Sequence, residues 1–131
     1  MIFVDSSFWI GQVIERDRRH AAADALSRIH AASPLATSTL VLGETWTFLR
    51  ARTWHSFAVA WLDTLATRKV AVHRIDAALE DEAWAWLRLH NERPYSFVDA
   101  TSFALMRKLR ITDALAFDGD FAAAGFTELR P

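Results

Sequence analysis

The sequence contains no cysteine, and only 4 glycines and 3 prolines in 131 residues. Without cysteine the chain has no disulfides, no thiolate zinc sites and no cysteine nucleophile, which is typical of a reducing compartment such as the cytoplasm. The scarcity of glycine and proline, together with 52% hydrophobic residues, excludes collagen-like, low-complexity and disordered classes. A chain of this length and composition is expected to fold as one domain over residues 1–131.

Long apolar segments and a strong charge bias are also missing. No hydrophobic run approaches the ~20 residues that cross a bilayer, and the first residues lack the basic start of a signal peptide. The net charge is −1 and the pI is about 6.5, so the composition indicates no broad basic surface for nucleic acid. We therefore expect no membrane association, and any nucleic-acid function must depend on a local site.

Short apolar or β-branched segments alternate with longer amphipathic ones along the chain. The predicted strands cover residues 2–4, 35–39, 70–75, 114–117 and 126–129. The first predicted helix begins near Phe8 after a cap at Ser6 or Ser7, and a later one begins after a cap at Asp76. The other predicted helices cover residues 18–33, 40–52, 54–68, 97–109 and 119–123. Strands separated by helices indicate βαβ units, so the sequence predicts a three-layer α/β/α domain around a mostly parallel sheet.

Four acidic residues occupy positions close to the ends of predicted strands. Asp5 directly follows the first strand, and Asp118 directly follows the fourth. Glu44 and Asp99 belong to predicted helices, and their spacing from apolar neighbours puts each on an apolar helix face. Because ligands of an open parallel sheet bind beyond the carboxyl ends of its strands, we expect these four acids to meet at one edge.

Each acid also has an ordinary structural explanation. Asp5, Asp99 or Asp118 could cap a helix, and Glu44 could pair with a base such as Arg50. None of the four has a basic residue beside it in sequence, however, and carboxylates ~4 Å apart repel by about 4 kcal/mol per pair at an effective dielectric of 20. A cluster of this kind requires a divalent cation. Oxygen ligands without His or Cys favour Mg²⁺ or Mn²⁺ over Zn²⁺.

Four segments in a fixed order carry a resemblance to a known family. They are Ile2–Ser7, Leu42–Thr45, Tyr95–Phe103 and Leu115–Phe121. Through them essentially the whole chain resembles the PIN-domain ribonucleases, specifically the VapC-type toxins of bacterial toxin–antitoxin pairs. This resemblance implies a PIN-like fold whose acidic pocket consists of Asp5, Glu44, Asp99 and Asp118, with Asp5 and Asp99 as metal ligands and Ser6 hydrogen-bonding within the pocket.

The same resemblance implies an activity and a partner. The activity is Mg²⁺-dependent cleavage of a structured RNA of the tRNA or rRNA class, and the partner is a small antitoxin whose C-terminal segment covers the site. Two positions depart from the family pattern. Ala116 stands where many members carry Thr or Ser, and Asp120 is a second candidate for the fourth acid. Asp118 is favoured as the fourth acid because it directly follows the predicted strand. Asp120 is given a supporting role.

Other proteins with acids at strand ends fit less well. The haloacid-dehalogenase type needs an Asp two residues after the first, where this chain has Ser7. A receiver domain needs a Lys after a late strand, which is missing, and DNA flap nucleases carry long extra helices for which 131 residues leave no room. The alternative that stays open is a PIN-like module that binds RNA or a partner without cleavage, although such a module would be expected to lose one or more of the acids.

Aromatic residues and arginines supply the remaining expectations. The predicted helical hairpin carries five large aromatics, namely Trp46, Phe48, Trp54, Phe57 and Trp61. We expect this surplus to form a homodimer interface and to contribute to an antitoxin groove, with a basic antitoxin side chain entering the acidic pocket. Arg50, Arg52 and Arg107 are candidates for a small number of phosphate contacts, which predicts a narrow range of RNA substrates.

Overall fold

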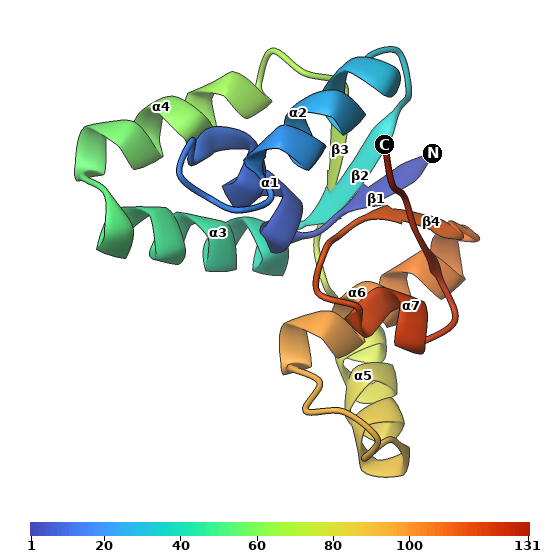
Figure 1. Ribbon diagram of the computed structural model, residues 1–131. Coiled ribbons are helices and arrows are strands. Elements are labelled where there is room, and N and C mark those ends of the chain that lie inside the picture. The colour runs from blue at the N-terminus through green and yellow to red at the C-terminus, as the bar shows by residue number, and fades with distance from the viewer.

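Five parallel strands form one sheet at the centre of the computed structural model, which describes residues 1–131 (Figure 1). The strands are β1 (Ile2–Val4), β2 (Leu35–Ser38), β3 (Val70–His73), β4 (Asp113–Leu115) and β5 (Thr127–Glu128). The helices are α1 (Ser6–Val13), α2 (His20–Ile29), α3 (Thr39–Arg52), α4 (His55–Leu65), α5 (Ala77–Leu89), α6 (Phe97–Leu109) and α7 (Asp120–Ala123). Every strand pairing is parallel, so the predicted α/β class is confirmed.

The strand order creates a switch point beside β1. The order across the sheet is β3-β2-β1-β4-β5, so the chain moves outward from β1 in one direction and then returns to the other side of β1. Figure 1 shows α1 to α4 gathered on one side of the sheet and α5, α6 and α7 on the other. An open parallel sheet has its crevice where the order reverses, which here is between the carboxyl ends of β1 and β4.

Most predicted helix boundaries are close to the observed ones. The predicted bounds of α6 match the structure, and Asp76 caps α5 by accepting a hydrogen bond from the Leu79 N–H at 2.9 Å. The cap of α1 was predicted wrongly, because Asp5 occupies the cap position instead of Ser6 or Ser7. The extended backbone of Asp5 lets its own carboxylate accept from the Ser7 N–H, so the helix begins one residue after the strand exit.

Several elements are shorter than predicted, among them α2 and β4. The second helix does not start at residue 18, because the chain first turns at Asp17, whose carboxylate accepts the Arg19 N–H at 2.8 Å. The fourth strand ends at Leu115, not at residue 117, so Asp118 does not directly follow it. None of the helices combines the length and apolar character that crossing a bilayer demands.

Aromatic side chains dominate the core on both sides of the sheet. On the α1 side, Trp61 of the hairpin is only 4% exposed and meets the fully buried Trp9 edge-on, with ring centroids 6.5 Å apart. On the other side, Phe103 is fully buried and its ring lies 5.1 Å from that of Trp86 and 5.0 Å from that of Phe121. Trp61 therefore belongs to the core, not to the exposed hairpin surface that its sequence position suggested.

We expect Phe103→Ala to lower the free energy of unfolding by about 3–5 kcal/mol, because the lost ring leaves a cavity among aromatic neighbours that cannot collapse fully. Urea denaturation followed by tryptophan fluorescence measures the change. Leu89→Ala is the control, since Leu89 is 81% exposed and its truncation is expected to stay within about 0.5 kcal/mol of wild type. Equal losses in the two variants would contradict this account of the core.

Candidate functional site

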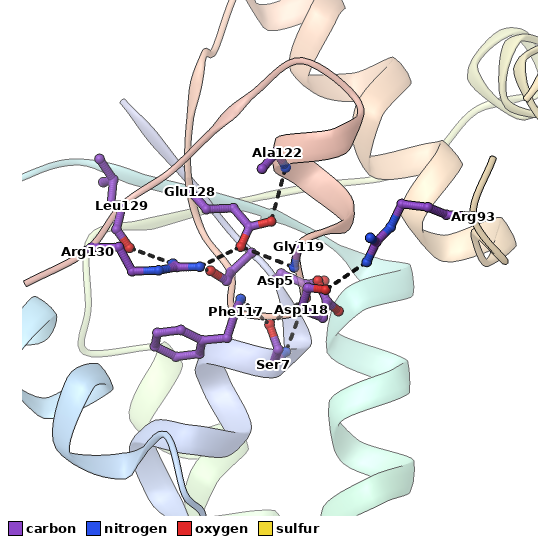
Figure 2. A network of polar contacts seen from close by, with 11 residues as sticks. Asp5, Ser7, Arg93, Phe117, Asp118, Gly119, Ala122, Glu128, Leu129 and Arg130 are labelled. Carbon is purple, nitrogen blue, oxygen red and sulfur yellow. Dashed lines mark hydrogen bonds and ion pairs between the residues drawn. The ribbon is translucent and has the colours of Figure 1, made fainter.

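Asp5 marks the point where β1 and β4 are joined at their carboxyl ends. Its N–H donates to the Leu115 carbonyl at 3.0 Å, and the residue is only 2% exposed. Ser7 holds the carboxylate, because its N–H and its Oγ both donate to Asp5 Oδ2, at 3.3 and 2.8 Å. Ser7 Oγ also accepts the Phe117 N–H at 3.1 Å, as Figure 2 shows. Asp5 is thus fixed between the first strand and the segment that follows the fourth.

Burial raises the pKa of Asp5 to about 7, and the negative charge of Asp118 adds to the rise. The hydrogen bonds from Ser7 oppose this rise in pKa, and the charge of Asp99 contributes further to it. No lysine, arginine or histidine forms an ion pair with any of these three aspartates. The structure therefore brings Asp5, Asp99 and Asp118 into one negative field in which none of the three carboxylates is directly paired with a cation.

Asp99 lies in the first turn of α6 and forms a capping box there. Its Oδ2 accepts the Ser96 N–H at 3.0 Å, while its own N–H donates to Ser96 Oγ at 2.9 Å. Its helix face continues into the fully buried Phe103 and Met106, as the sequence spacing predicts. Burial raises the pKa of Asp99 to about 6, and the charges of Asp120 and Asp118 act in the same direction.

The structure separates the two candidates for the fourth acid. Arg93 forms an ion pair with Asp120, with 2.8 Å between Nε and Oδ1, and donates to the Asp118 carbonyl at 3.0 Å. The Asp118 carboxylate has no cationic partner, and partial burial together with the charge of Asp120 raises its pKa. Asp120 therefore helps to anchor the loop through its ion pair, whereas the Asp118 carboxylate forms no ion pair of its own.

Glu44 lies on the exposed side of α3 and is linked to the site through Ser6 alone. The prediction that it lies on an inward apolar face is wrong, because the buried line of that helix runs through Val41, Thr45 and Leu49, and Glu44 is exposed. Its Oε1 accepts a hydrogen bond from Ser6 Oγ at 2.5 Å. Ser6 thereby connects Glu44 to the beginning of α1, one residue from Asp5.

A network that sequence reasoning missed supports the loop carrying Asp118. The side chain of Glu128, in β5, is only 3% exposed. It accepts the N–H groups of Gly119 and Ala122 at 3.3 and 3.0 Å and pairs with Arg130 at 2.8 Å (Figure 2). Gly119 has a φ of +84°, which favours glycine. The available sequence signal was an acid inside a short predicted strand, without a visible partner.

The donor set fits a hard divalent cation in its chemistry, although the side chains do not converge on one point. No three His, Asp or Glu side chains lie at the spacing that a shared metal ion requires. The Ser7 and Ser96 hydrogen bonds direct Oδ2 of Asp5 and of Asp99 toward their own helix starts, and Oδ1 of each receives no protein hydrogen bond. Unpaired carboxylate oxygens without nitrogen or sulfur donors match the preference of Mg²⁺ and Mn²⁺.

Comparison with known proteins gives consistent results over the whole chain. The model of the PIN domain family matches residues 2–127. The chain is 53% identical over 133 aligned residues to the 23S rRNA-specific endonuclease VapC20 of Mycobacterium tuberculosis, covering 100% of this chain and 99% of that protein. The crystal structure of M. tuberculosis VapC20, described as a sarcin–ricin loop cleaving toxin, matches with a TM-score of 0.91, 52% identity and full coverage of both chains.

In a metal-free buffer with chelator, we expect the free energy of unfolding to fall as the pH rises from about 4 to 7. In this window the folded protein keeps a proton on Asp5 that the unfolded chain releases, so the stability from this group is complete below pH 3.8 and is lost near pH 7. One such group contributes a slope of up to about 1.4 kcal/mol per pH unit. Urea unfolding at a series of pH values measures it.

Two variants test whether this pH dependence belongs to Asp5. Asp5→Asn keeps a neutral side chain at every pH, so its unfolding free energy should fall less steeply, especially between pH 6 and 7, and should exceed that of wild type near pH 8. The fall that remains belongs to Asp99 and Asp118, whose pKa values are also raised. Asp63→Asn changes an exposed aspartate on α4 and should follow wild type. An Asp5→Asn profile that parallels the wild-type profile would show that the buried carboxyl is not the titrating group.

Proposed function

This chain belongs to the PIN-domain family as a nuclease of the VapC toxin type, and we propose that it is a Mg²⁺-dependent endoribonuclease that cleaves the sarcin–ricin loop of 23S rRNA. The observation that carries this proposal is Asp5, which is buried where β1 meets β4 and shares its field with Asp99 and Asp118 without a cationic partner. The choice of RNA is supported by the substrate of the relative that is 53% identical.

Under this proposal the residues of the site have distinct tasks. Asp5 and Asp99 would hold Mg²⁺, for which Mn²⁺ can substitute, while Glu44 and Asp118 complete the acidic pocket. A bound ion of this kind lowers the pKa of a water molecule and stabilises the charge that develops on the scissile phosphate. Ser7 keeps the Asp5 carboxylate oriented. In-line attack by water leaves a 5′-phosphate and a 3′-hydroxyl.

Two of the three arginines expected to contact phosphates form no ion pair with the protein's own acids. Arg50 and Arg52 are exposed in the last turn of α3. Arg107, expected to be a third candidate, lies 3.5 Å from a carboxylate oxygen of Glu82, which partly neutralises it. With so little nonspecific attraction for RNA, productive binding must come from a few positioned contacts, and we expect a narrow substrate range. An rRNA substrate also implies action in the cytoplasm.

We expect Asp99→Asn and Asp5→Asn to lose more than about a hundred-fold in cleavage rate, beyond the 10- to 100-fold typical of losing an outer partner of a metal ligand. The assay is Mg²⁺-dependent cleavage of a synthetic sarcin–ricin loop RNA, with sequencing of 5′-phosphate ends after brief expression in cells. Mg²⁺ should raise the melting temperature of wild type and raise that of Asp99→Asn less.

The control for this experiment is Asp63→Asn, which should cleave like wild type. Near wild-type activity in either site variant would contradict the assignment of the acids. Uniform degradation of all single-stranded RNA would contradict the narrow substrate range. Tight RNA binding by wild type without any cleavage would support the alternative of a binding module.

We further propose that the protein forms a homodimer and binds a small antitoxin as the toxin of a type II pair, with the α3–α4 hairpin contributing to both interfaces. Two large hydrophobic side chains of the hairpin are exposed, Trp54 with 63% and Leu62 with 44% of its surface accessible. The surface that can form these interfaces is therefore centred on these two residues. The antitoxin would insert a basic side chain among Asp5, Asp99 and Asp118, where its charge replaces the missing protein cation.

Light scattering at tens of micromolar protein tests the dimer. Wild type should have the mass of two chains, and Trp54→Ser should shift it toward one chain, because an apolar contact is removed from the interface. Trp84→Ser changes a tryptophan on α5 that is 51% exposed, and it should leave the mass unchanged. A monomeric wild type at this concentration would rule out the dimer.

A further inference from the structure

Gly43 lies in the interior of α3, where the fold gives no reason for a glycine. A Cβ atom placed on it would meet nothing within 4 Å, and its φ is not positive. Glycine is the least favourable helix-interior residue after proline, because it loses the most backbone freedom on folding. Gly119 is different, since its positive φ requires glycine. The absence of a side chain at Gly43 therefore calls for an explanation outside the folded chain itself.

Gly43 borders a groove between α3 and the beginning of α6. The groove is shallow and wide open to solvent, with a volume of about 640 Å³. Its lining includes Gly43, Glu44, Thr47 and Phe48 from α3 and Phe97 and Val98 from α6. Glu44 belongs both to this lining and to the acidic site, where Ser6 binds it. The groove is thus continuous with the site proposed for cleavage.

The two aromatic residues of the groove are held by neighbours. Phe97 is stacked on Trp84, with ring centroids 4.2 Å apart and an angle of 22° between the planes. The guanidinium of Arg52 lies 4.8 Å from the centroid of the Phe48 ring. Aromatic surfaces beside a cation complement a nucleotide, which joins a flat apolar base to an anionic phosphate.

We propose that this groove receives an unpaired base of the RNA, next to the phosphate that is cleaved, with Phe48 and Phe97 as its stacking surfaces and the Gly43 backbone as its floor. This inference rests on the proposed ribonuclease function, because the adjoining acids locate the scissile phosphate. A planar ring approaches the helix backbone closely only where no Cβ intervenes. Proteins read RNA loops mainly through unstacked bases inserted among aromatic side chains.

Gly43→Leu tests the groove by filling it. This change improves helix propensity and meets no neighbouring atom at its Cβ, so the variant should melt at or above the wild-type temperature. Its Mg²⁺-induced shift in melting temperature should equal that of wild type. Its KM for the sarcin–ricin loop RNA should rise roughly ten-fold or more, as expected for losing one stacked base. Ala60→Leu adds the same side chain at an exposed position of α4 and should leave KM unchanged.

A coupled experiment identifies the occupant as a base. RNAs that carry a single abasic nucleotide at each position around the cleavage site are tested with wild type and with Gly43→Leu. One abasic position should raise the wild-type KM as much as the leucine does, and the two changes together should cost no more than either alone. This abasic series on wild type also keeps the test decisive should the leucine variant fold poorly.

Other outcomes overturn the proposal. Wild-type cleavage that is insensitive to every abasic substitution, or losses that add, would show that no base occupies the groove. Normal RNA cleavage by Gly43→Leu with loss of antitoxin binding would assign the groove to a peptide. A wild type that cleaves no RNA would instead overturn the proposed function, and the groove inference would fall with it. Insensitivity to abasic substitution, additive losses, or loss of antitoxin binding alone would each leave the nuclease assignment intact.

Discussion

The burial of one carboxyl group, that of Asp5, is the constraint on which the site depends. Asp5 directly follows β1, bonds through its N–H to the end of β4 and caps α1 with its side chain. The strand order makes this position inevitable, because β1 lies at the centre of the sheet and the switch point is beside it. An acid here cannot avoid desolvation, and the same desolvation that raises its pKa strengthens its pull on any cation.

The neighbouring acids are held by groups that fix their position without cancelling their charge. Ser7 holds Asp5 and the Ser96 backbone holds Asp99, and in both cases the donors are neutral N–H or O–H groups. Charged partners are used one step away, where Arg93 pairs with Asp120 and Arg130 pairs with Glu128. The result is a rigid loop around carboxylates that stay mutually repulsive, which is the arrangement that makes a divalent cation the complementary ligand.

Local sequence patterns predicted the elements and the aspartates but not the long-range partners. The predicted bounds of the Asp99 helix match the structure, where a Ser96–Asp99 capping box, a pattern confined to four residues, begins the helix. The orientation of Glu44 was wrong because α3 is apolar around much of its first turns, so spacing alone could not choose its buried face. Arg93 and Glu128 were missed because the residues they bind are separated from them by up to 27 positions along the chain, and no periodicity connects such pairs.

The use of arginines inside the fold bears on how an acidic site can bind RNA at a net charge of −1. Arg93 and Arg130, which bind the loop that carries Asp118, are engaged with carboxylates of the protein itself, so their positive charge stabilises the fold and is not available to phosphates. Affinity must then come from a few cations such as Arg52 together with uncharged surface, and the groove that Glu44 borders presents two aromatic rings, Phe48 and Phe97. Stacking depends on an accessible base and not on the number of phosphates, so it favours unpaired loops over duplex RNA. Gly43 weakens its own helix but keeps the surface of the groove open. This is consistent with a site in which charged residues hold the acids in place and the shape of the groove selects the substrate.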